Sequence, residues 1–141
     1  MGTPDIWDNA SGSQRKGTRY VARWKVMLVF DSAANKPAFK TMTNDLSLDG
    51  VSVQYHSEEI THTVLTLLLS LPPIENIPRK TIRLKAEVIS RIPFRGGFRL
   101  GMRFIQDAEV DKFRQCFEDY VVADGELCSD PEAEEFPILN L

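Results

Sequence analysis

Strict alternation of apolar and polar residues is the feature that most constrains the fold of this chain. The alternation is clearest at Ile82, Leu84, Ala86 and Val88, because a period of two places every second side chain on the same face of a strand. The same period, or a short β-rich apolar run, recurs at five other places. The six predicted strands cover residues 20–30, 39–46, 51–55, 64–71, 81–92 and 98–104. The chain is therefore predicted to be mainly β.

Turn sequences separate the predicted strands. Gly96-Gly97 lies between the last two strands, where it predicts a tight hairpin. Pro72-Pro73 follows the fourth strand and ends it, because proline has no N–H to donate to a neighbouring strand. Short connections of this kind favour antiparallel pairing of consecutive strands.

One segment near the end of the chain has a helical period instead. Val110, Phe113 and Phe117 recur at the spacing of an amphipathic helix, and Asp107 is the predicted N-cap. Closing a sheet removes its exposed edges, and a helix can cover the open mouth. The prediction is a small six-stranded antiparallel β-barrel, split or Greek-key-like, with one C-terminal α-helix.

Charge divides the 141 residues unevenly. The net charge is −3, but residues 105–141 contain eleven acids and two bases, whereas residues 1–104 contain fifteen bases and nine acids. Such asymmetry favours an anion-binding body with an acidic extension. We predict a flexible leader at 1–13, one barrel domain with its helix at 14–122, and an acidic tail at 123–141, whose apolar end either docks on the barrel or a partner or frays.

Several classes of protein are disfavoured. The longest mostly apolar run, residues 64–71, is far below the roughly 20 residues that span a bilayer. The first residues carry acids where a secretory signal carries bases, so no membrane insertion and a cytoplasmic location are expected. Cys116 and Cys128 are predicted to be reduced thiols. His56 and His62 belong to a predicted solvated loop, so no metal site is expected, and no catalytic motif indicates an enzyme.

A first candidate binding motif is R-x-x-x-R, formed by Arg15 and Arg19 just before the first strand. In an extended chain these residues share a face about 13 Å apart, a span that suits a dinucleotide-sized ligand. Guanidinium groups bind phosphate bidentately and also stack on or hydrogen-bond to guanine. Gln14 and Lys16 flank the motif and are weaker candidates for ligand contact.

A second candidate motif is D-x-S-x-x-G, formed by Asp45, Ser47 and Gly50 at the end of the second strand. On a continuing strand Asp45 and Ser47 would face the same way, so that the carboxylate accepts from a guanine or orients an arginine and the hydroxyl donates to an oxygen. Gly50 permits positive φ and close approach of a ligand to the backbone. The alternative is purely structural, because Asp49-Gly50 between strands also predicts a type I′ hairpin.

The order and separation of these motifs, ahead of the strand at 98–104 and its helix, resemble the PilZ domain family over residues 14–122. That family consists of bacterial receptors for the second messenger cyclic di-GMP (c-di-GMP). The resemblance implies that Arg15 and Arg19 grip guanines and phosphates, and that Asp45, Ser47 and Gly50 contact a guanine on the barrel surface. No other cofactor is implied.

The first functional prediction is therefore a non-enzymatic c-di-GMP receptor that switches an unidentified effector protein in motility, exopolysaccharide or biofilm control. The alternative is a nucleotide-independent adaptor of the same fold, with the acidic tail as a docking peptide. An RNA or single-stranded DNA binder is disfavoured, since Tyr20 and Trp24 alternate as buried residues and the pI is near 5.4.

Overall fold

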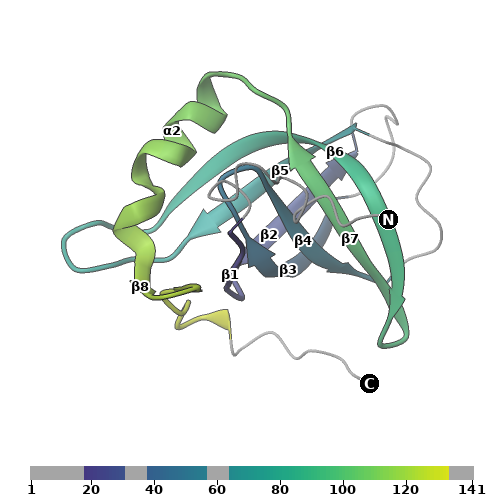
Figure 1. The fold of residues 1–141 in the computed structure, drawn as a ribbon, viewed down its shortest axis with the longest axis horizontal. Helices are drawn as coiled ribbons and strands as arrows, with labels where there is room; N and C mark the ends of the chain where they lie inside the picture. The colour runs from purple at the N-terminus through teal and green to yellow at the C-terminus, as the bar shows by residue number, and fades with distance from the viewer. Residues whose placement is uncertain (1–17, 31–37, 57–63, 134–141) are drawn as a thin grey trace.

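A computed structural model of the protein describes residues 18–30, 38–56 and 64–133. These residues form mainly strands, joined near the end of the chain by one α-helix and a short 3₁₀ turn (Figure 1). The elements are β1 (Tyr20–Val21), β2 (Lys25–Phe30), β3 (Phe39–Leu46), β4 (Gly50–Tyr55), β5 (Val64–Leu71), β6 (Lys80–Phe94), β7 (Gly97–Phe104), α2 (Ala108–Phe117), η2 (Glu118–Tyr120), β8 (Val121–Ala123) and β9 (Glu126–Leu127).

Six of the strands close into a barrel. Their order is β2-β5-β6-β7-β4-β3, and β3 pairs again with β2, so that each of the six has two neighbours. Every pairing within the ring is antiparallel. Helix α2 lies over one end of the barrel (Figure 1). The predicted six-stranded antiparallel barrel with one C-terminal helix is thereby confirmed.

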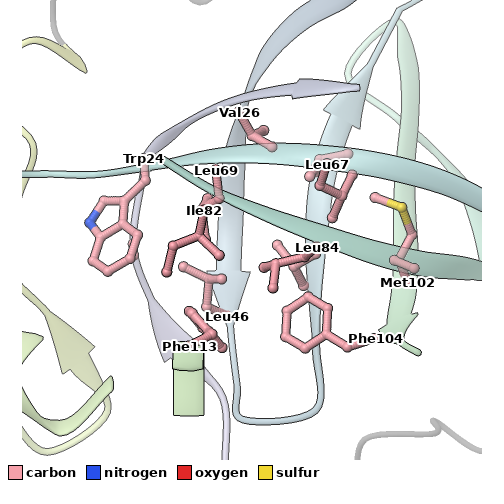
Figure 2. Close-up of a cluster of buried hydrophobic side chains, with 14 of the residues drawn as sticks. Trp24, Val26, Leu46, Leu67, Leu69, Ile82, Leu84, Met102, Phe104 and Phe113 are labelled. Atoms are coloured by element: carbon pink, nitrogen blue, oxygen red, sulfur yellow. The ribbon is translucent and has the colours of Figure 1, made fainter. Parts of the chain in front are cut away.

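The barrel is filled by the apolar side chains of the alternating pattern. Leu67, Leu84 and Met102 come from three different strands and are fully buried in one cluster (Figure 2). Helix α2 adds Phe113, whose ring packs edge-on against Phe104 at 5.4 Å between centroids. Because the helix contributes its buried face to this cluster, it completes the core at the end of the barrel.

The helix begins where the sequence predicts. The Asp107 carboxylate accepts a hydrogen bond from the Val110 N–H at 2.9 Å and so caps the first turn. Glu109 and Asp111 lie in that turn, near the positive end of the helix dipole. Helix α2 has ten residues, and within 18–30, 38–56 and 64–133 no helix has the length and apolar character that crossing a bilayer requires.

The first predicted strand is interrupted. Residues 20–30 form β1 and β2 instead of one strand, because the Thr43 hydroxyl accepts from the Trp24 N–H at 3.0 Å in place of a backbone carbonyl. The Trp24 indole is fully buried and donates to the Cys128 carbonyl at 2.9 Å. Trp24 at the interruption therefore links the start of the barrel to the C-terminal segment.

The hairpin between β6 and β7 turns one residue earlier than predicted. Its central residues are Arg95 and Gly96, with φ of 48° and 83°, as a type I′ turn requires. Gly97 is already the first residue of β7, and a Cβ there would lie 2.6 Å from the Tyr55 carbonyl oxygen. Gly96 thus supplies the turn conformation, whereas Gly97 permits close approach of β7 to β4.

Residues 121–133, which include the first part of the predicted acidic tail at 123–141, pack on the barrel. Strands β8 and β9 form a small hairpin, and Val21 of β1 pairs in parallel with Glu126. Leu127 and Asp130 are only 3% exposed. The segment folds because it carries buried groups between its exposed acids. Residues 134–141 and the predicted leader at 1–13 lie outside the described residues.

Candidate functional site

The structure brings one residue of each predicted motif together. Arg19 lies just before β1, Asp45 lies near the end of β3, and β1 pairs with this end of β3. The nearest guanidinium nitrogen of Arg19 is 3.9 Å from the Asp45 carboxylate. Gln14, Arg15 and Lys16 lie outside the described residues, so their predicted ligand contacts remain predictions.

A β-bulge in β3 places Asp45 opposite Ser52 of β4. Thr43 faces Val53 on β4, yet Asp45 faces Ser52, so β3 advances two residues while β4 advances one. Asn44 is the extra residue, and a bulge of this kind changes which side chains share a face. Asp45 consequently faces Ser52 across the pair of strands.

The Asp45 side chain is only 10% exposed, and its carboxylate is held by two hydrogen bonds. Its Oδ1 accepts from the Ser52 hydroxyl at 3.1 Å. Its Oδ2 accepts from the Arg99 guanidinium, also at 3.1 Å. A carboxylate at this depth needs such partners, because removing a charge from water without compensation is costly. The site thus has a negative centre whose Oδ2 lies within 4 Å of two guanidinium groups, those of Arg19 and Arg99.

Arg99 extends the site along β7. It faces Gln54 of β4 in the strand pairing, and its guanidinium lies 5.5 Å from the centroid of the Phe94 ring. Stacking on an aromatic face and pairing with a carboxylate fix the direction of the guanidinium plane. About a third of the Arg99 side chain remains exposed, so the arginine can meet a ligand from solvent.

Ser47 is held within the turn that follows β3, and the predicted shared face of Asp45 and Ser47 stays a prediction. Strand β3 ends at Leu46, and the Ser47 side chain is fully buried in the turn that follows. Its hydroxyl oxygen accepts from the N–H groups of Asp49 at 3.0 Å and Gly50 at 3.1 Å. Ser47 thereby satisfies two backbone donors within the turn.

Gly50 is likewise part of the fold of this turn. The positive-φ glycines among the described residues are Gly96 and Gly125, so Gly50 does not use the positive φ that glycine permits, and the type I′ alternative at Asp49-Gly50 is wrong. The Gly50 carbonyl instead accepts from the Ser47 N–H at 2.9 Å, and Gly50 is buried as the first residue of β4.

Helix α2 clamps the turn from outside. Arg114 donates from Nε to the Leu48 carbonyl at 2.9 Å and pairs with the Asp49 carboxylate at 3.1 Å. The turn that ends the D-x-S-x-x-G motif is therefore fixed both by Ser47 and by the helix. A fixed turn sets the position of β4, and with it Ser52, beneath Asp45.

Sequence reasoning missed Ser52, Arg99 and Arg114. Ser52 and Arg99 lie within the predicted strands at 51–55 and 98–104, and Arg114 lies within the predicted helix, but none of them belongs to either motif. The available signal for Arg99 was its position among outward arginines in the alternating stretch 98–104, but the register that brings it to Asp45 is a tertiary property.

The thiols and histidines do not form a second site in the part of the chain that the structure describes. Cys116 and Cys128 are free, and burial raises the pKa of each thiol, which keeps the reactive thiolate scarce at neutral pH. Within the described ranges no group of three or more histidine, cysteine or carboxylate side chains could hold a metal ion. His62 lies outside these ranges.

Comparison with known proteins identifies the family. The PilZ domain model matches residues 13–123, which is most of the chain, so this protein belongs to the PilZ domain family. No curated protein sequence gives a match.

Solved structures share the fold at low identity. The Bacillus subtilis inhibitor of motility MotI/DgrA aligns with a TM-score of 0.54 and 17% identity, over 72% of this chain and 48% of that protein, about half its length. The PilZ domain of CeSA from a cellulose-synthesizing bacterium gives 0.49 and 16%, over 71% and 97%. The c-di-GMP complex of the Escherichia coli YcgR PilZ domain gives 0.47 and 16%, over 70% and 84%.

Proposed function

We propose that this protein is a non-enzymatic receptor for c-di-GMP, which binds on the outer face of the barrel around Asp45. The observation that carries the proposal is the meeting of the two motifs, since Arg19 approaches the Asp45 carboxylate that Arg99 already holds. Family membership supports the same ligand class.

The chemistry of the site suits a guanine dinucleotide. Guanidinium groups bind phosphate oxygens through two parallel hydrogen bonds and stack on flat bases. The Asp45 carboxylate has acceptor capacity for the N–H groups of a guanine edge. Arg15 and Arg19 bind phosphate and base in this proposal, Asp45 and Arg99 read the guanine, and Ser47 and Gly50 keep the adjacent turn in shape.

Binding can be transmitted through β1. The R-x-x-x-R motif leads directly into β1, which pairs with β3 on one side and with β9 on the other. The Tyr20 ring also packs against Phe117 of the helix at 5.1 Å. A ligand that contacts both residues 14–19 and β3 therefore acts on the strand that holds the C-terminal hairpin, and it shifts the conformational equilibrium by its differential affinity for the two states. The surface altered in this way is the proposed contact for an effector protein.

Calorimetric titration with c-di-GMP tests the proposal. We expect saturable binding to the full chain, weakened about 10- to 100-fold by Arg19→Ala, because a hydrogen bond to a charged group contributes about 1.5–3 kcal/mol. Arg83→Ala is the matched control. Arg83 is exposed on β6, which lies across the ring from β3, so losing this charge should leave affinity unchanged.

Two results would overturn the receptor proposal. One is the absence of heat and of a thermal shift at high c-di-GMP concentration, which would favour the nucleotide-independent adaptor. The other is an equal loss of affinity in Arg19→Ala and Arg83→Ala, which would show a response to overall charge and not to this site.

A further inference from the structure

A groove lies on the outer face of the barrel along β2, away from Asp45. Its volume is about 280 Å³. Met27 and Leu68 form its apolar centre, facing each other across β2 and β5, while Lys40 faces Met27 from β3. Lys25 and Ser70 also line it. Lys40 and Asp45 are five residues apart on β3, about 17 Å along a strand, so the groove is distinct from the proposed nucleotide surface.

The last described residues of the chain lie at the rim of this groove. The Glu132 carboxylate is 2.6 Å from the ammonium nitrogen of Lys25. Ser70 accepts from Arg79 at 2.6 Å, and the same guanidinium holds Asp130. Two residues that line the groove are thus tied to the segment just before Ala133. The chain therefore continues from the groove edge into residues 134–141.

The sequence that continues from this point matches the lining. Glu134 and Glu135 come first, followed by the apolar Phe136-Pro137-Ile138-Leu139. Eight extended residues reach up to about 28 Å. Pro137 favours an extended backbone for itself and for the residue before it, as a segment lying across strands requires. The acids of this segment complement the lysines that line the groove, and its apolar residues complement the apolar centre of the groove.

We propose that residues 134–141 dock in this groove, with Phe136 and Ile138 on Met27 and Leu68 and with Glu135 paired to Lys40. The docked segment covers an apolar patch that would otherwise face water. The inference goes beyond the proposed function, because neither the groove nor its occupant involves the nucleotide surface.

Methionine methyl NMR on the full-length chain tests the docking directly. The chain has four methionines, Met27 among them, and the Met27 resonance can be assigned with Met27→Leu. The double variant Phe136→Ser/Ile138→Ser should shift the Met27 methyl signal toward the position of a solvated methionine. Met102 is fully buried inside the barrel and its signal should stay in place. Asn140→Ser is the matched control and should move neither signal.

Charge exchange provides a second test that does not depend on apolar contacts. Lys40→Glu should shift the Met27 signal in the same direction as the double serine variant, and adding Glu135→Lys should restore it. An unchanged Met27 signal in both the serine variant and Lys40→Glu would overturn the proposal. A Met27 signal that changes on dilution would overturn docking within one chain, since it would place the segment of a second copy in the groove.

Discussion

Two aspartates, Asp45 and Asp130, lie in similarly buried positions and are held by arginines in different ways. The Asp130 side chain is fully buried and takes two parallel bonds from Arg79, at 2.7 and 3.1 Å. Its Oδ1 also accepts from the Glu132 N–H at 2.9 Å. From the described part of the chain, Asp45 receives one bond from Arg99 and one from Ser52, and the nearest guanidinium nitrogen of Arg19 is 3.9 Å away.

The difference separates a structural ion pair from the proposed binding site. In the Arg79–Asp130 pair, two parallel hydrogen bonds join the planar guanidinium to the planar carboxylate. This pair, the Asp130 clasp, fixes the C-terminal segment to the barrel. The looser set around Asp45 leaves the carboxylate with acceptor capacity for another molecule, and about a third of the Arg99 side chain is exposed beside it. Buried carboxylates with incomplete partner sets are therefore better ligand candidates than those with complete ones.

Asp130→Asn should have the largest effect on stability. Breaking a buried ion pair leaves an uncompensated partner, and with Arg79 partly exposed we expect a loss of about 2–4 kcal/mol in the free energy of unfolding. Urea denaturation gives the value. The control is Glu87→Gln, which removes an exposed pair with Arg103 and should change stability by less than about 0.5 kcal/mol. Equal effects of the two variants would mean that the clasp is not structural.

Asp45→Asn should affect c-di-GMP affinity more than stability. The amide retains an acceptor for Ser52 while losing the charge, so stability should change by about 1 kcal/mol or less. Affinity for c-di-GMP should fall about tenfold or more, because one charge-assisted contact is lost. Calorimetry and urea denaturation on the same preparation distinguish the two effects. If Asp45→Asn were as unstable as Asp130→Asn with unchanged affinity, the contrast between the two sites would be refuted.

Ser47→Ala should affect stability more than binding. Removing the hydroxyl leaves the N–H groups of Asp49 and Gly50 without this acceptor, at a cost of about 1–2 kcal/mol. Affinity should change by less than about threefold, since Ser47 shapes the turn and is fully buried. A large loss of affinity at full stability would instead assign the serine a direct ligand contact.

The smallest expected effect is the pH dependence of the Asp130 clasp. Burial, the largest influence, acts to raise the pKa of Asp130, but hydrogen bonds from Arg79 and the Glu132 N–H outweigh it and lower the pKa. The unfolded carboxyl, with a pKa of about 3.9, therefore takes up a proton before the folded one does. The clasp should contribute fully to the free energy of unfolding above about pH 4 to 5, and this contribution should be lost as the pH falls through the folded-state pKa. The difference in stability between wild type and Asp130→Asn should then shrink in acid, and a constant difference would contradict the assigned pKa direction.

Much of the fold could be predicted because it depends on local pattern. Alternation at Ile82, Leu84 and Ala86 specifies which face of a strand is buried, and these residues are buried as predicted. The Asp107 cap and the helical spacing after it likewise depend on residues within one or two turns. The interruption at Trp24 could not be predicted in this way, because its cause is Thr43, nineteen residues later.

The candidate site was only partly predictable for the same reason. The two motifs identified Arg19 and Asp45, but the bulge at Asn44, the partner Arg99 and the turn clamp Arg114 arise from pairing between distant segments. The motif likewise did not show that the Ser47 hydroxyl accepts from the Asp49 and Gly50 N–H groups inside the turn, since that depends on where β3 ends.

The amino-acid sequence by itself determined the strands, the helix and the residue types that suit an anionic nucleotide, because these depend on neighbours along the chain. The tertiary structure decided which charged side chains are fully paired and which keep capacity for a ligand. It made Asp130 part of a closed clasp in a segment that the sequence presents as a tail, and it left Asp45 open beside Arg19 and Arg99. The physical reason is that the availability of a charge depends on burial and on partners from distant strands.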